Sequence, residues 1–131
     1  MRGGNDQNKI IHKELSYRIV GILYDVYNEL GYGHPEKLYE KAIAKAFDDA
    51  AISYNEQAYF NLTYRGKTVG KYYIDFIVDG KIVLELKKGS HFPRRNIEQV
   101  KKYLQAADLR LAILANFTPQ GVKFLRILNN Y

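Results

Sequence analysis

Residues 72–88 read YYIDFIVDGKIVLELKK, two short apolar runs on either side of an Asp-Gly pair. Asp-Gly between such runs is the strongest short signal for a tight hairpin, so we expect two antiparallel strands here. Charges on Asp75, Glu85 and Lys87 interrupt runs that otherwise read as buried strands. A buried carboxylate costs on the order of several kcal/mol unless it is paired or holds a metal. We therefore expect these three residues to have a chemical function rather than a purely structural one.

The spacing of these charges predicts where they lie on the sheet. Side chains in a strand alternate between its two faces, so Glu85 and Lys87 share one face while Leu84 and Leu86 enter a core on the other. The hairpin places the strand of Asp75 beside that of Glu85, which brings two carboxylates and an ammonium to one spot. The alternative interpretation is an Asp to Lys ion pair on a half-solvated sheet face.

Helices and strands are predicted on both sides of this hairpin. Helical periodicity of apolar residues predicts three helices, over about residues 11–30, 35–50 and 93–107. Alternating patterns and short apolar runs predict five strands, over residues 54–64, 68–78, 82–87, 109–115 and 122–128. We expect the last strand at an edge and the strand before it inside the sheet. This order indicates the α/β class, with a mixed central β-sheet flanked by helices.

The length of 131 residues is typical of one domain. Residues 1–9 are polar and Gly-rich, so we expect a disordered N-terminal segment followed by a single domain over residues 10–131. The absence of cysteine excludes disulfides, thiolate nucleophiles and Cys-rich zinc sites. The sequence has neither a signal-like stretch nor a long apolar run, so we expect a cytoplasmic protein without membrane contact.

The charge of the chain favours a polyanionic partner such as nucleic acid, since the formal net charge is +6. Basic residues gather between the charged strands and the third helix: Lys87, Lys88, Arg94, Arg95, Lys101 and Lys102. They could follow a phosphate backbone, or they could form an ordinary solvated helix face. The 12 tyrosines can be interpreted in two ways as well. Some could stack on bases, or they could be aromatic residues of the core and its rim.

Converging carboxylates repel one another unless a cation lies among them, and hard oxygen donors suit Mg²⁺ or Mn²⁺. Asp75 and Glu85 are the candidate ligands, and the Leu86 carbonyl could add another donor. Such a site activates water and stabilises charge on a phosphate. Lys87 would then orient or deprotonate the attacking water, or steady the phosphate in the transition state.

Asp75, followed by Glu85 and Lys87 in an E-x-K spacing inside a strand meander, resembles the active-site signature of the PD-(D/E)XK nuclease superfamily. Residues 33–39 (GHPEKLY) resemble the G-x-x-E-x-x-Y pattern of the GxxExxY proteins, one family within that superfamily. Residues 114–117 (LANF) resemble the hydrophobic-x-Asn-Phe segment of the same family. The resemblance covers residues 15–128.

The resemblance implies a restriction-endonuclease-like core and divalent-metal-dependent hydrolysis of phosphodiester bonds, with DNA as the expected substrate and RNA left open. It makes Glu36 the first-helix acid, with a role at the metal beside Asp75 and Glu85. It also matches Gln99 and Tyr103 to the Q-x-x-x-Y signature of RecB-like members. The chain departs from the family pattern just before Glu36, where His34 and Pro35 replace a residue that is often bulky and apolar.

Reasoning from the residues alone leaves other roles open for these flanking positions. Glu36 could simply favour the helix dipole in the first turn, and Gln99 and Tyr103 could lie on a solvated helix face. Glu40 and Glu56 are secondary candidates for the site. Among the histidines, His91 alone lies in a loop that could close over it.

Two further functions compete with the nuclease interpretation. A nucleic-acid-binding or assembly module could keep the nuclease fold without turnover, and a small scaffold would bind no nucleic acid at all. Retention of Glu36, Asp75, Glu85 and Lys87 favours the enzyme, because a pure binder gains nothing from acids that face a polyanion without a metal. A homodimer stays open, since nucleases that cut both strands often act in pairs, although no apolar stripe is clearly spare.

Overall fold

The computed structural model describes residues 11–129, so the predicted segment 1–9 lies outside the described residues. Within them the elements follow the order α2 (Lys13–Leu30), α3 (Glu36–Asp49), β1 (Tyr54–Tyr64), β2 (Lys67–Val78), β3 (Ile82–Lys88), α4 (Arg94–Ala107), β4 (Leu111–Thr118) and β5 (Gly121–Leu128). The predicted order of helices and strands is therefore confirmed. None of the helices in this part of the chain is long and apolar enough to span a membrane.

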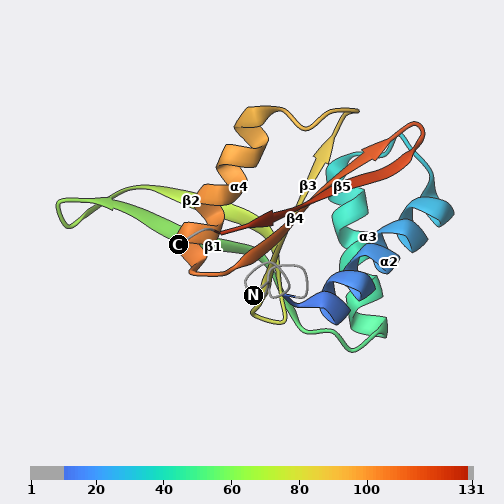
Figure 1. The fold of residues 1–131 in the computed structure, drawn as a ribbon, viewed down its shortest axis with the longest axis horizontal. Coiled ribbons are helices and arrows are strands. Elements are labelled where there is room, and N and C mark those ends of the chain that lie inside the picture. Colours follow the sequence, from blue (N-terminus) through green and yellow to red (C-terminus); the bar gives the residue numbers. More distant parts are fainter. Residues whose placement is uncertain (1–10, 130–131) are drawn as a thin grey trace, which may run out of the picture.

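The five strands form one mixed sheet in the order β1-β2-β3-β4-β5 (Figure 1). All neighbouring strands are antiparallel except β3 and β4, which are parallel. A parallel pair needs a long crossover, and α4 supplies it here. The predicted α/β class with a mixed central sheet is confirmed, and β5 is an edge strand as expected.

Helices cover both faces of the sheet, α2 and α3 on one and α4 on the other (Figure 1). Alternation along β3 divides its side chains between two cores. Leu84 and Leu86 pack in the core beneath α2 and α3. Val83 packs on the other side with Val100 and Leu104 of α4. β3 is therefore covered on both faces, which explains its nearly continuous apolar sequence.

Local backbone geometry sets the element boundaries. Asp79 and Gly80 have φ values of 53° and 62°, the positive pair that the Asp-Gly signal predicts for the β2–β3 turn. β4 begins at Leu111 rather than at the predicted residue 109. The reason is that Asp108 adopts φ 55° at the end of α4, and the Leu109 N–H donates to the Leu104 carbonyl at 3.1 Å. This closure of the helix delays the strand by two residues.

The β1–β2 hairpin continues far beyond its neighbour in the sheet. β2 pairs with β3 only from Phe76 to Val78, whereas the β1–β2 ladder runs on to Tyr64↔Lys67. Residues 57–74, called the arm below, therefore project from the body as a two-stranded ribbon (Figure 1). Strands β2 and β3 diverge at the base of the arm, and that divergence forms the site described next.

Candidate active site

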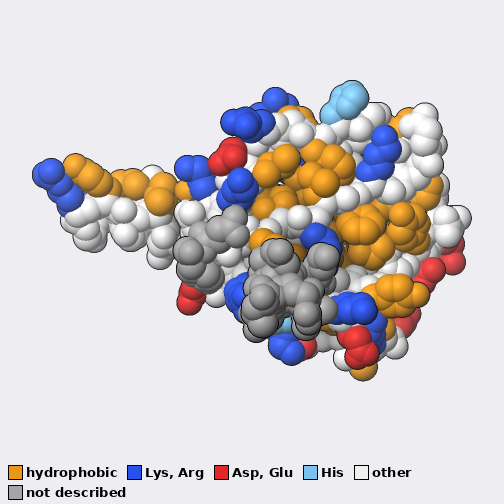
Figure 2. All heavy atoms as spheres, in the orientation of Figure 1, with side chains coloured by type: hydrophobic (Ala, Val, Ile, Leu, Met, Phe, Trp, Pro, Cys, Tyr) orange, Lys and Arg blue, Asp and Glu red, His pale blue; other side chains and the backbone are white. Residues whose placement is uncertain are grey.

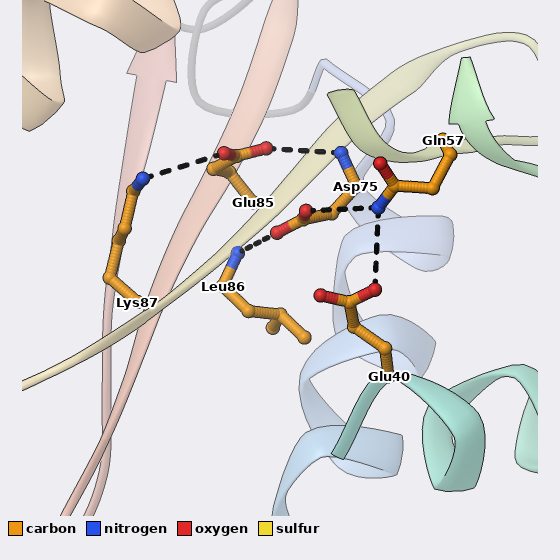
Figure 3. Close-up of polar contacts among 6 residues, drawn as sticks. All are labelled: Glu40, Gln57, Asp75, Glu85, Leu86 and Lys87. Carbon is orange, nitrogen blue, oxygen red and sulfur yellow. Dashed lines mark hydrogen bonds and ion pairs between the residues drawn. The ribbon is translucent and has the colours of Figure 1, made fainter. Parts of the chain in front are cut away.

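Asp75 and Glu85 lie where β2 and β3 separate (Figure 3). The backbone ladder between these strands ends at Phe76↔Leu84. At the next position the carboxylates replace it: the Asp75 N–H donates to Oε1 of Glu85 at 3.1 Å, and the Leu86 N–H donates to Oδ2 of Asp75 at 2.8 Å. Both acids are thus fixed by the backbone of the opposite strand, and the predicted meeting of the two carboxylates is confirmed.

Lys87 is the cation next to this pair, on the same face of β3 as Glu85 (Figure 3). Its Nζ lies 3.7 Å from Oε2 of Glu85. Glu85 itself is only 4% exposed. The alternative of an Asp to Lys pair on a half-solvated face does not describe this arrangement, because the ion pair involves Glu85 and that carboxylate is buried.

The two carboxylates disfavour each other's charge. Burial, followed by the charge of Asp75, raises the pKa of Glu85 to about 8, although the Asp75 N–H and Lys87 oppose this rise. Burial also raises the pKa of Asp75, against the opposing effect of the Leu86 N–H. A single lysine therefore leaves the pair undercompensated, which is the condition that a bound divalent cation would relieve.

A third carboxylate, Glu40 of α3, is joined to Asp75 through Gln57 (Figure 3). The Nε2 of Gln57 donates to Oε1 of Glu40 at 3.3 Å and to Oδ1 of Asp75 at 3.4 Å. Glu40 is 7% exposed, and burial, followed by the charge of Asp75, raises its pKa. Glu40 is one of the two secondary candidates from the sequence, whereas Gln57 is not among the residues predicted for the site. The other secondary candidate, Glu56, is exposed on β1.

Gln57 has an unusual backbone for a strand residue, with φ 51°. A residue other than glycine in this region carries a local energetic cost that the surrounding structure must offset. Neither its identity nor its position in an alternating strand signals this conformation in the sequence. The bridge between Glu40 and Asp75 could therefore be found only in three dimensions.

Glu36 lies in the first turn of α3, one turn before Glu40, and is half-buried. Its charge contributes to the raised pKa values of Glu40 and Glu85, so it acts on the site electrostatically. In the described residues no three Asp, Glu or His side chains gather tightly enough to form a metal site by themselves. The oxygen donors centre instead on the Asp75 and Glu85 pair.

The two segments that resemble the GxxExxY pattern meet in the structure. The Tyr39 ring contacts Phe117 of β4, with centroids 4.3 Å apart and planes at 61°. Its hydroxyl donates to the Gly31 carbonyl at 2.6 Å and accepts from the His34 N–H at 3.3 Å. Tyr39 thus fastens the loop before α3 to the sheet and sets the start of the helix that carries Glu36 and Glu40.

Asn116 of β4 is the register partner of Lys87 and is buried. Its Nδ2 donates to the Gly89 carbonyl at 3.2 Å and to the His91 carbonyl at 2.5 Å. The strand of Lys87 and the loop that follows it are therefore held by one side chain. His91 contributes its backbone here, while its side chain is exposed.

Tyr103 and Gln99 occupy one face of α4, one turn apart. Tyr103 is buried in the core against the sheet, and its ring packs against that of Tyr72, with the ring centroids 5.6 Å apart. A solvated helix face is therefore wrong for Tyr103. Burial and the charges of Glu85 and Asp75 raise its pKa to about 12. The buried Oε1 of Gln99 has no hydrogen-bond partner within residues 11–129.

The basic residues singled out in the sequence are exposed at the end of β3 and along α4. This set comprises Lys88, Arg94, Arg95, Lys101 and Lys102. Lys101 lies 3.7 Å from Glu98 in an exposed pair on the same helix, the kind of pair that contributes little to stability. The structure leaves all five side chains accessible to a polyanion.

Comparison with known proteins gives three results. A family model described as the PD-(D/E)XK nuclease superfamily matches residues 13–127. A search of curated proteins finds no match. Among solved structures, the chain is similar to SSO0001 (TM-score 0.59, 16% identity) and to an alkaline exonuclease, LHK-Exo, from Laribacter hongkongensis (TM-score 0.52, 13% identity).

These alignments cover 73% and 72% of this chain but only 50% and 56% of the two solved chains. The chain thus spans about half the length of the structures that it matches. At such low identity the likeness concerns the fold alone. Together with the family match, it supports the restriction-endonuclease-like core that the sequence predicts.

Proposed function

Because the chain belongs to the PD-(D/E)XK nuclease superfamily, we propose that it is a divalent-metal-dependent nuclease that hydrolyses phosphodiester bonds in DNA. The observation that carries this proposal is the pair of buried carboxylates, Asp75 and Glu85, cross-bonded to the backbone with one lysine as counterion. We further propose that the chain is a GxxExxY member and that residues 10–131 form one nuclease-like domain.

The donor set fits Mg²⁺ or Mn²⁺, because its side-chain donors are carboxylate oxygens that repel one another when charged. Asp75 and Glu85 would hold the cation, with Glu36 and the Leu86 carbonyl as further donors. Bound there, the cation would lower the pKa of a water and stabilise charge on the phosphate.

The protein side chains have separate tasks in this proposal. Lys87 places an ammonium at the edge of the site, where it donates hydrogen bonds to the attacking water or to a phosphate oxygen. Tyr103, whose pKa is raised to about 12, stays protonated and acts as a hydrogen-bond donor. Gln99, one turn before it on α4, helps Tyr103 to position the DNA strand.

Two further sets of residues support this site. Gln57, itself bonded to Glu40, holds Oδ1 of Asp75 in one orientation. The exposed cations Lys88, Arg94, Arg95, Lys101 and Lys102 supply phosphate contacts to the DNA backbone. Such contacts position a strand without reading its sequence.

The test is cleavage of end-labelled DNA in the presence of Mg²⁺ by the wild type, Asp75→Asn and a matched control, Asp49→Asn. Asp49 is an exposed acid at the end of α3, paired with Lys45 at 2.9 Å. We expect Asp75→Asn to lower the rate on the order of 10²-fold or more and the control to be unchanged. Equal cleavage by both variants would overturn the assignment of Asp75.

A second candidate function is a nucleic-acid-binding or assembly module without turnover. The observation that favours it is the absence, within residues 11–129, of three Asp, Glu or His side chains clustered as a metal site. In that case the wild type would bind DNA in a salt-dependent manner but cleave none with either Mg²⁺ or Mn²⁺.

A further inference from the structure

One face of the arm, residues 57–74, is open to solvent along its whole length. Its other face is anchored at the base, where Phe60, Tyr72 and Ile74 pack with the core beneath α4. Because strand side chains alternate, Tyr73 and Lys71 lie on the opposite face, the one that also carries Asp75. That face thus runs along β2 from Asp75 through Tyr73 to Lys71.

Aromatic rings are the main feature of this exposed face. Tyr59 and Tyr73 are register partners on β1 and β2, with ring centroids 6.0 Å apart and planes at 44°. They are 55% and 54% exposed, although burial of such rings is strongly favoured. Nζ of Lys71 lies 4.5 Å from the Tyr59 centroid. Two open aromatic rings and an ammonium are thus presented together.

The charge of the arm has a single sign. Between Gln57 and Ile74 the sequence contains three cations, Arg65, Lys67 and Lys71, and no acidic residue. Figure 2 shows hydrophobic side chains in a row along the projecting arm and basic side chains at its tip. The exposed apolar residues of the arm are Tyr59, Leu62, Tyr64, Val69 and Tyr73. An aromatic surface interleaved with cations is complementary to a nucleic-acid strand.

We propose that this face of the arm binds single-stranded DNA that continues from the scissile phosphate at the proposed active site, with unpaired bases stacked on Tyr59 and Tyr73 and a phosphate contacted by Lys71. Tyr73 is two residues from Asp75, about 7 Å along an extended strand. Nucleotides in a stacked strand are spaced by about 3.4 Å, so the ring pair lies within roughly two nucleotides of the scissile bond. Stacking on a tyrosine ring accepts any base, so this contact would not depend on the DNA sequence.

A second copy of this chain fits the same surface less well. A symmetric contact would place the cations of one arm, Arg65, Lys67 and Lys71, against a second arm that carries the same charge and no acid to neutralise them. A DNA strand offers a partner for each kind of group on this face: flat bases for the tyrosine rings and phosphates for the cations. This assignment rests on the proposed function, because it assumes that the DNA strand cleaved at the site of Asp75 is the same strand that continues along the arm.

The test measures fluorescence anisotropy of a labelled 20-nucleotide oligo(dT) and of a labelled 20-bp duplex in EDTA, which prevents metal-dependent cleavage. The variants are the double substitution Tyr59→Ala with Tyr73→Ala, the conservative double substitution to Phe, and Tyr17→Ala as control. Tyr17 is a tyrosine on α2, outside the arm, that is more exposed than either, at 82%. Thermal melting of each variant reports whether the fold is retained.

We expect the double Ala variant to bind oligo(dT) roughly 10-fold to 100-fold more weakly, with the duplex affected much less. The Phe pair and Tyr17→Ala should bind like the wild type. Lys71→Ala should reduce the slope of log affinity against log salt by about 0.7. Unchanged oligo(dT) affinity in the double Ala variant, or an equal loss for the duplex, would overturn the assignment, as would a wild-type dimer that this variant turns into a monomer.

Cleavage of the same oligonucleotide with Mg²⁺ separates this inference from the proposed function. If the wild type cleaves and the double Ala variant binds normally, the arm assignment fails and the nuclease stands. If the wild type binds oligo(dT) through the two tyrosines but cleaves nothing, the arm assignment stands and the nuclease proposal fails.

Discussion

The backbone N–H of Asp75 donates a hydrogen bond to Oε1 of Glu85 at the position where the β2–β3 ladder ends. The reciprocal bond, from the Leu86 N–H to Asp75, closes the same gap. Two carboxylates thus perform the pairing that backbone carbonyls perform in the rest of the sheet. The arrangement satisfies two backbone donors and at the same time holds two acids close together inside the protein.

The first prediction separates the structural role of Asp75 from its charge. Asparagine at position 75 keeps an oxygen that can accept from the Leu86 N–H, whereas alanine leaves this donor without its acceptor. We expect Asp75→Ala to be about 1–3 kcal/mol less stable than Asp75→Asn in urea unfolding. Both variants should lack cleavage activity. Equal stability of the two would mean that the Leu86 bond contributes nothing to the fold.

The second prediction concerns pH in the absence of metal. The pKa of Glu85 is raised from 4.5 to about 8 in the folded protein, so the folded state keeps a proton that the unfolded state has lost between these values. Stability should therefore fall as pH rises through this window, by up to about 1.4 kcal/mol per pH unit.

Urea unfolding at pH 5, 6.5 and 8 in EDTA measures this effect, and Glu85→Gln is the matched variant. Its amide cannot ionise, so the variant should show a flatter profile and should exceed the wild type in stability at pH 8. The interpretation fails if wild-type stability increases over this range or if Glu85→Gln retains the full slope.

The third prediction concerns Gln57, which bridges Glu40 and Asp75 from a backbone with φ 51°. Both Gln57→Ala and Gln57→Gly remove the bridge and should lower the cleavage rate roughly tenfold, because Asp75 loses its fixed orientation. The glycine variant should be more stable than the alanine variant by about 1 kcal/mol, since glycine accepts a positive φ without strain. Single-turnover rates and urea midpoints of the pair check both parts; unchanged rates would show that the bridge has no role.

The fourth prediction assigns Tyr39 to the architecture of the site. Tyr39→Phe loses hydroxyl contacts with Gly31 and His34, at a cost of about 1 kcal/mol. Tyr39→Ala also loses the packing against Phe117 and should cost about 3–5 kcal/mol. We expect folded Tyr39→Phe to cleave at close to the wild-type rate. A loss of activity in this variant at full stability would instead give the hydroxyl a direct role.

Much of this architecture could be predicted from the sequence because local chemistry and global fold agree. The Asp-Gly turn fixed the β2–β3 hairpin, and period-two alternation placed Glu85 and Lys87 on one face and Leu84 on the other. Asp75 could be identified because a charge inside an apolar strand needs a compensating partner. These inferences depend only on neighbours along the chain or across one turn.

The remaining features depend on contacts that no local pattern encodes. The divergence of β2 from β3 on the N-terminal side of Phe76 and the positive φ of Gln57 are properties of the folded sheet. They decide that Glu40, and not Glu36, is linked to Asp75 through a hydrogen-bond bridge. The projection of the arm also depends on where the pairing between β2 and β3 stops, and the lengths of the strands alone do not give this position.

The most direct measurement of the central claim is calorimetric titration of Mg²⁺ and Mn²⁺ into the wild type and into Asp75→Asn, with and without a bound oligonucleotide. We predict saturable binding to the wild type that is lost in the variant, because the site depends on the paired charges of Asp75 and Glu85. Failure of the wild type to bind either cation at millimolar concentration, even with DNA present, would contradict the metal-dependent nuclease.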